Sequence, residues 1–113
     1  MHREDWSPTE KRIARAVFEE AVAAECEEIL AEFKQRAAAL VDPDDMFSLG
    51  KWVAEEERRL ARRYDFRYSE LPYVFGDLLR EGRIAEEELQ GLSPDKLERI
   101  RGFAAPRPSL TPA

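Results

Sequence analysis

Apolar residues recur at helical spacing along the first forty residues. Ser7-Pro8-Thr9-Glu10 has the form of a capping box with proline at the first helical position, so we expect a helix to begin at Pro8. An apolar stripe then continues in steps of three and four, without Gly or Pro, until Asp42-Pro43 ends it. The stripe consists of Phe18, Val22, Cys26, Ile29, Phe33, Ala37 and Leu40.

A second amphipathic pattern begins at Pro43 and predicts a helix that runs to about Arg63. Asp44 and Asp45 place negative charge at the positive end of this helix. Gly50 inside the pattern costs up to about 1 kcal/mol relative to Ala, which close approach of another backbone would explain. The apolar face consists of Met46, Leu49, Val53, Leu60 and Tyr64.

The next segment predicts a third, shorter helix. Ser69 is expected to cap it, Pro72 falls in the first turn, where proline is tolerated, and Gly82 ends it. The apolar residues follow the spacing of an amphipathic helix. They are Leu71, Val74, Phe75, Leu78 and Leu79.

Two further helices are expected before the C-terminus. A short acidic helix over residues 85–90 should close at Gly91. The last helix opens at Ser93-Pro94, where Leu92 and Leu97 have the spacing of a hydrophobic staple. The chain is therefore expected to be helical from its first capping box to about residue 103.

The length of the first helix has a consequence for assembly. A helix over residues 8–40 would be about 50 Å long, whereas a compact chain of this size has a radius of gyration of roughly 13 Å. The helix must therefore extend beyond its own domain, and its apolar stripe needs cover. A second copy is the simplest supplier, so we expect a homodimer. The alternative is a helix that breaks near Ala21 to Ala24 and folds back on itself.

These patterns predict an all-α fold for the 113-residue chain. Residues 1–103 should form one helical domain, with a long two-helix stalk over residues 8–63 and a small head of short helices over residues 69–103. The proline-rich residues 104–113 are expected to be disordered. The whole is expected to be dimeric.

Charge and composition exclude several functions. The 24 acidic and 18 basic residues give a net charge of −6, which argues against non-specific binding to nucleic acid or anionic lipid. No apolar run is long enough to cross a membrane and no secretory signal is present, so we expect a cytoplasmic protein without membrane insertion. One cysteine and one histidine supply neither an intrachain disulfide nor a zinc set, and we expect no metal and no cofactor.

The same inventory argues against an enzyme. His2 is the one histidine and lies near the terminus, so no serine or cysteine has an evident base, and the five scattered glycines build no phosphate-binding loop. A basic cluster remains, either as a nucleic-acid patch or, more simply, as a solvated face balanced by the neighbouring Glu55 to Glu57. It consists of Arg58, Arg59, Arg62, Arg63 and Arg67.

The predicted head carries aromatic and arginine residues, a composition typical of interface anchors. Phe75 lies on the apolar face and is expected in the core, whereas Tyr73 lies beside that face. The other members of the group are Tyr68, Arg80, Arg83 and Arg99.

Nearly the whole chain resembles the fluorescence recovery protein family, the regulators of orange carotenoid protein in cyanobacterial photoprotection. The resemblance lies in the register of many short motifs, none of which carries chemistry alone. The motifs are Trp6-Ser7 with Glu10, Phe18, Ala21, Asp44-Asp45, Leu49, Tyr64-Asp65, Phe75, Glu81-Gly82, Ala85 to Leu89, and Asp95-Lys96.

The resemblance implies an all-helical homodimer that acts without catalysis. In that family the protein binds photoactivated orange carotenoid protein, speeds its return to the orange form and helps to detach it from the phycobilisome, so that quenching ends. Partner-binding positions carry over to Tyr73, Arg99 and Phe47. Dimer contacts carry over to Leu30, Met46 and Leu49, and the apolar stripe adds Phe33.

The sequence departs from the family pattern on the second helix. Where the family has Trp, His, Asp and Arg, this chain has Phe47, Gly50, Lys51 and Glu57, and the last two invert the charge. An alternative is therefore a divergent dimeric adaptor that has the same scaffold and an unrelated protein client.

Overall fold

The computed structural model describes residues 5–106, which form four α-helices and one 3-10 helix. The helices are α1 (Pro8–Ala38), α2 (Pro43–Arg63), α3 (Leu71–Arg80), η1 (Glu86–Leu89) and α4 (Pro94–Ala104). The acidic segment after residue 85 is thus a single 3-10 turn. The predicted tail overlaps α4 at Ala104, and residues 107–113 lie outside the described residues.

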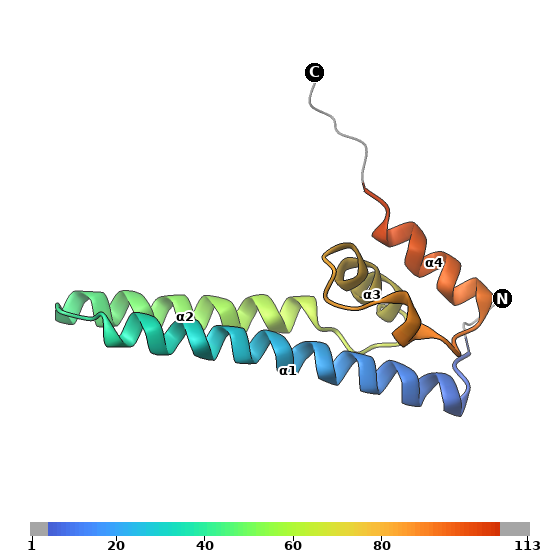
Figure 1. Ribbon diagram of the computed structural model, residues 1–113, viewed down its shortest axis with the longest axis horizontal. Coiled ribbons are helices and arrows are strands. Elements are labelled where there is room, and N and C mark those ends of the chain that lie inside the picture. Colours follow the sequence, from blue (N-terminus) through green and yellow to red (C-terminus); the bar gives the residue numbers. More distant parts are fainter. Residues whose placement is uncertain (1–4, 107–113) are drawn as a thin grey trace, which may run out of the picture.

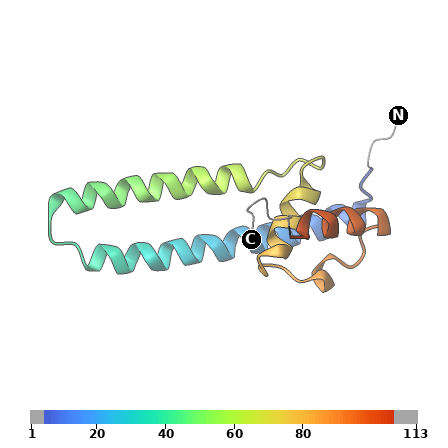
Figure 2. The ribbon, with the colours of Figure 1, turned by 90° about the horizontal axis from the view of Figure 1, so that it is seen from above.

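The molecule is elongated because α1 runs along its whole length (Figure 1). Helix α2 returns antiparallel beside the C-terminal half of α1, and we call this pair the hairpin (Figures 1 and 2). Elements α3, η1 and α4, which we call the end cluster, gather at the N-terminal half. The radius of gyration is 17.8 Å. Because α1 is continuous through Ala21 to Ala24, the alternative of a broken first helix is wrong.

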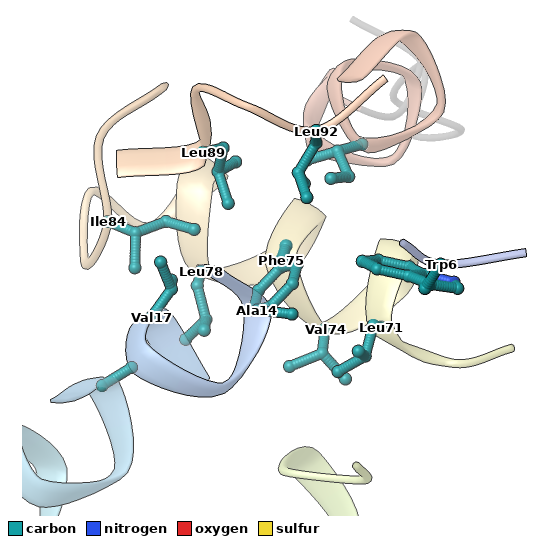
Figure 3. Close-up of a cluster of buried hydrophobic side chains, with 12 residues drawn as sticks. Trp6, Ala14, Val17, Leu71, Val74, Phe75, Leu78, Ile84, Leu89 and Leu92 are labelled. Atoms are coloured by element: carbon teal, nitrogen blue, oxygen red, sulfur yellow. The ribbon is translucent and has the colours of Figure 1, made fainter. Parts of the chain in front are cut away.

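The end cluster packs on a face of α1 that the predicted stripe does not include. The buried apolar residues of α1 are Ala14, Val17 and Ala21, and Figure 3 shows Leu78 of α3 beside Val17. Small side chains let α3 approach α1 closely, so they form the contact instead of the larger residues of the stripe. Phe18, the first residue of that stripe, lies at the edge of this core, where its ring packs edge-on against Tyr64 and Phe66.

The helix ends follow the predicted capping residues with one exception. Ser7 and Glu10 form the full capping box, and the Asp42 carboxylate accepts from Asp44 N–H at 3.1 Å. Ser69 does not cap α3: the N-cap is Glu70, and no side chain bonds the first turn there. The N–H groups of Glu70 and Leu71 donate instead to the carbonyl of Arg67. The backbone of the preceding turn therefore satisfies the start of α3, a role that was expected of the Ser69 side chain.

Gly82 ends α3 as predicted, with a positive φ of 77°. The N–H of Arg83 donates to the Leu78 carbonyl at 2.9 Å, and the N–H of Gly82 donates to the Leu79 carbonyl at 3.1 Å. This is the hydrogen-bond pattern of a Schellman motif, which requires a left-handed residue at this position.

Gly76 allows α3 and α4 to touch. A Cβ added at Gly76 would lie 2.5 Å from Phe103 Cβ, whereas one added at Gly102 would meet nothing within 4 Å. We therefore expect Gly76→Ala to lower the free energy of unfolding by about 1–3 kcal/mol through overpacking. Gly102→Ala, also in a helix, should be neutral or stabilising by up to about 1 kcal/mol. Urea unfolding of both variants checks this, and equal effects would contradict the close contact.

Candidate protein-binding surfaces

The described residues contain neither a cluster of metal-ligating side chains nor a membrane-spanning helix. Among residues 5–106, no group of three or more His, Cys, Asp or Glu side chains is placed to hold a metal ion. None of the helices in that range combines the length and apolar character that a membrane span requires.

A buried carboxylate joins the hairpin to the end cluster. Glu25 of α1 is 2% exposed, and its Oε2 lies 2.9 Å from Arg63 Nε and accepts from the Tyr64 hydroxyl. Its Oε1 lies 3.3 Å from Arg59 Nη1 and 3.7 Å from Arg83 Nη2. The side chains that converge on this one acidic residue of α1 come from α2, from Tyr64 just after α2, and from Arg83 between α3 and η1. We call this group the Glu25 cluster.

The arginines of the Glu25 cluster have a second set of carboxylate partners. Arg63 makes a bidentate pair with Glu81 at 2.8 and 2.6 Å, and Arg83 makes one with Glu28 at 2.9 and 2.8 Å. These partners raise the guanidinium pKa of Arg63 and Arg83 above the ordinary value, so both stay charged. The pKa of Tyr64 is raised to about 12, mainly because its hydroxyl is buried and in addition because it donates a hydrogen bond to Glu25.

The Glu25 cluster was not predicted. The arginines of the predicted basic cluster do not act together, because Arg59 and Arg63 contact Glu25 whereas Arg67 pairs with Asp65. Of the acids expected to balance this cluster, Glu55 to Glu57, Glu56 does so by pairing with Arg59 at 2.7 Å. A signal was present, since Glu25 continues the helical spacing of the small buried residues of α1.

A second buried acid lies at the other end of that face. The carboxylate of Glu10 accepts from the N–H of Ser7, the N-cap of α1, and from the N–H of Ser93, the N-cap of α4. Lys96 Nζ lies 3.3 Å from Glu10 Oε1 and donates to the Asp5 carbonyl. Burial alone would raise the pKa of Glu10, but these hydrogen bonds outweigh it and hold the pKa below its usual range. One carboxylate thus ties the starts of α1 and α4 together.

An apolar groove runs along the hairpin between α1 and α2. It has a volume of about 400 Å³ and is lined by apolar residues of both helices, with Glu56 and Glu57 beside them. Leu30 and Phe33 are 44% and 39% exposed there. The apolar lining residues are Cys26, Ile29, Leu30, Phe33, Val53 and Leu60.

The other predicted dimer residues lie near the tip of the hairpin. Met46 is half exposed, whereas Leu49 is 7% exposed and therefore already covered within the protomer. Leu49 has little surface left to offer a partner. Phe47, predicted to bind a partner, is 64% exposed on the first turns of α2. A Cβ added at Gly50 would meet nothing within 4 Å, so no backbone of the described residues approaches this glycine.

The predicted partner-binding residues of the end cluster are exposed on two helices that pack together. Tyr73 of α3 is 49% exposed, and its ring stacks on Phe103 of α4 with centroids 3.9 Å apart. Arg99 is exposed on α4. Phe75 is fully buried, as predicted for a core residue. Tyr68 does not join Tyr73, because its ring packs against Trp6 and Phe66.

Three comparisons with known proteins find the same family over most of the chain. The family model described as "Photoprotection regulator fluorescence recovery protein" matches residues 6–104. The chain is 32% identical over 99 residues to the Fluorescence recovery protein of Synechocystis sp. (strain ATCC 27184 / PCC 6803 / Kazusa), covering 88% of this chain and 91% of that protein. The described structure is also similar to two solved structures.

Both solved structures have a TM-score of 0.81 against this chain, and each match covers 88% of this chain and 98% of the other. The first is the Fluorescence Recovery Protein of Fremyella diplosiphon, at 28% identity. The second is that of Synechocystis sp PCC 6803, at 32% identity.

The Glu25 cluster should contribute strongly to stability. Removing its charge in Glu25→Gln leaves three arginines around a neutral group, and we expect the free energy of unfolding to fall by about 3 kcal/mol. Glu28→Gln removes an acid from the exposed rim of the same cluster and should cost less than about 1 kcal/mol. Urea unfolding of both variants at neutral pH tests this, and a Glu25→Gln variant as stable as Glu28→Gln would contradict it.

Glu10 predicts a pH dependence of stability. Because folding lowers the pKa of this carboxyl, its charged form contributes stability above the unfolded pKa of about 4.3, and the contribution is lost as pH falls through the lower folded value. Glu10→Gln should therefore have a lower free energy of unfolding than the wild type at pH 7, and this difference, the stability gap, should become smaller in acid. Denaturant unfolding from pH 7 to pH 3 measures this gap, and a constant gap would show that Glu10 ionisation is unimportant.

Proposed function

The chain belongs to the fluorescence recovery protein family of photoprotection regulators, and we propose that it is a homodimeric, non-catalytic regulator that binds photoactivated orange carotenoid protein. By this binding it accelerates the return of that protein to the orange form and so ends quenching. The observation that carries the proposal is the family match over residues 6–104 together with a similarity of the whole fold.

The exposed surfaces support a protein that works by binding. The hairpin presents apolar side chains that a second copy would cover, at Leu30 and Phe33 in the groove and at Met46 near the tip. In this proposal the hairpin is the stalk of a dimer and the end cluster is its head. Tyr73 and Arg99, both exposed on the head, would then contact the client.

Acceleration without catalysis has a simple physical basis. A regulator that binds the transition state of the conformational change, or the compact state, more tightly than the separated domains lowers the barrier or shifts the population. No bond has to form or break. Rigid, exposed side chains such as Tyr73, held by its stack on Phe103, suit this role because little entropy is lost on binding.

A second candidate function follows from the α2 positions that differ from the family pattern. Lys51 and Glu57 carry charges opposite to those of the family, so a client surface complementary to the family pattern would be repelled here. Phe47 and Gly50 also differ. A dimeric adaptor with an unrelated protein client is the alternative that these residues favour.

The test is the dark reversion rate of photoactivated orange carotenoid protein, followed by absorbance. A stoichiometric amount of this chain should accelerate reversion several-fold. A variant with the family residues restored, Phe47→Trp with Gly50→His, Lys51→Asp and Glu57→Arg, should bind the carotenoid protein at least tenfold more tightly, which is about 1.4 kcal/mol.

Two results separate the candidate functions. Acceleration by the wild-type chain would show that the altered α2 residues are not needed. No acceleration by either form, with the restored variant folded by circular dichroism, would overturn the proposal and favour the adaptor.

A further inference from the structure

We propose that a basic patch near the start of α1, formed by Lys11, Arg12 and Arg15, binds a short acidic segment of a partner protein, in which carboxylates flank an apolar or aromatic side chain. The patch shares no residue with the hairpin groove or with the exposed pair Tyr73 and Arg99. The inference therefore goes beyond the proposed function and does not depend on it.

The three cations of the basic patch line one depression. Lys11, Arg12 and Arg15 leave α1 within an arc of about 100° around the helix axis, so their side chains lie on one side of the helix. All three are exposed, and with Tyr68 they line an open depression of about 610 Å³. Tyr68 belongs to the connector between α2 and α3. A ligand in this depression would contact both cations and an aromatic ring.

Aromatic rings lie close to two of the cations. Lys11 Nζ lies 5.4 Å from the centroid of the Tyr68 ring, and Arg15 Cζ lies 3.9 Å from that of Phe66. Such contacts restrict the side chains but do not neutralise them, because a ring face has no formal negative charge. The basic patch is thus partly ordered before a partner arrives, which lowers the entropy lost on binding.

The charge of the basic patch is not balanced within the part of the chain that the structure describes. Among residues 5–106, Lys11 and Arg12 form no ion pair, and Arg15 has one long contact, with Glu19 at 3.8 Å. The guanidinium of Arg12 donates to the hydroxyl of Thr9 at 3.3 Å, which is a neutral acceptor. The patch therefore keeps its charge available for an external anion.

The position of the basic patch is unfavourable for the isolated chain. The start of a helix carries partial positive charge, which repels cations. Lys11 and Arg15 are four residues apart, a spacing at which like charges also repel each other. Glu10 does not compensate, because it is buried and already holds Lys96 and the N–H of Ser93. Residues that break a local rule without a gain inside the chain mark a functional site, and an external anion would supply the gain here.

The spacing and chemistry of the basic patch favour carboxylates of a peptide. Lys11 and Arg15 are about 6 Å apart along the helix axis. Same-face side chains of an extended peptide repeat at about 6.6 Å, so two neighbouring acids can reach both cations. The guanidinium groups of Arg12 and Arg15 match carboxylates in a bidentate manner, and the ring of Tyr68 offers apolar surface between them. A long polyanion suits the chain less well, because the net charge of −6 repels it outside the patch.

The test uses the whole chain and a synthetic peptide in which glutamates flank one phenylalanine, measured by isothermal titration calorimetry at low salt. The variant with Lys11→Gln, Arg12→Gln and Arg15→Gln should bind this peptide at least tenfold more weakly than the wild type. A second peptide, with glutamine in place of each glutamate, should bind the wild type at least tenfold more weakly than the acidic peptide. Because the contact is ionic, added salt should also weaken binding of the acidic peptide.

A matched control removes three cations elsewhere. Lys34→Gln, Arg58→Gln and Arg62→Gln change the net charge as much as the first variant, and all three residues are exposed on the hairpin. This control should bind the acidic peptide like the wild type. Circular dichroism and urea unfolding check that both triple variants are folded.

The outcomes decide this inference separately from the proposed function. Equal weakening in the two triple variants would overturn it, because net charge and not the basic patch would then govern binding. A wild-type chain that does not bind the acidic peptide would also overturn it. So would patch-dependent binding of single-stranded RNA or anionic lipid vesicles that is tighter than binding of the peptide. The proposed function is tested without the peptide, by reversion of the carotenoid protein, so each can fail alone.

Discussion

The fold depends on one face of α1, where small apolar residues lie between two buried acids. Ala14, Val17 and Ala21 let the end cluster approach closely, but apolar contact has no direction and would not by itself fix where the cluster sits. Glu10 and Glu25 supply that direction, because each carboxylate collects donors from several elements. Removing the Glu25 charge would leave its arginines only their outer carboxylates, and removing that of Glu10 would break its ion pair with Lys96. The two sites therefore constrain the molecule more than equal apolar area would.

This use of one face of α1 leaves the adjacent face free for other molecules. The end cluster and the buried acids are satisfied within the chain, whereas the hairpin groove and the exposed tip have no partner in the described residues. Exposed contiguous apolar surface marks an interaction site in a soluble protein. The proposed function, regulation by binding, would need this division: a rigid interior that keeps its shape, and outer surfaces whose side chains are already in position to bind.

The features that follow from local spacing were predicted correctly from the sequence. The capping box at Ser7, the break at Asp42-Pro43 and the helix end at Gly82 depend on a few neighbouring residues, and the structure has all three. The Glu25 cluster joins residues up to 58 positions apart. Local spacing can place Glu25 on the buried face of α1, but it does not indicate which arginines reach it. The apolar stripe of α1 also did not indicate which face of that helix packs on the end cluster, because the residues buried there are small ones, Ala14, Val17 and Ala21.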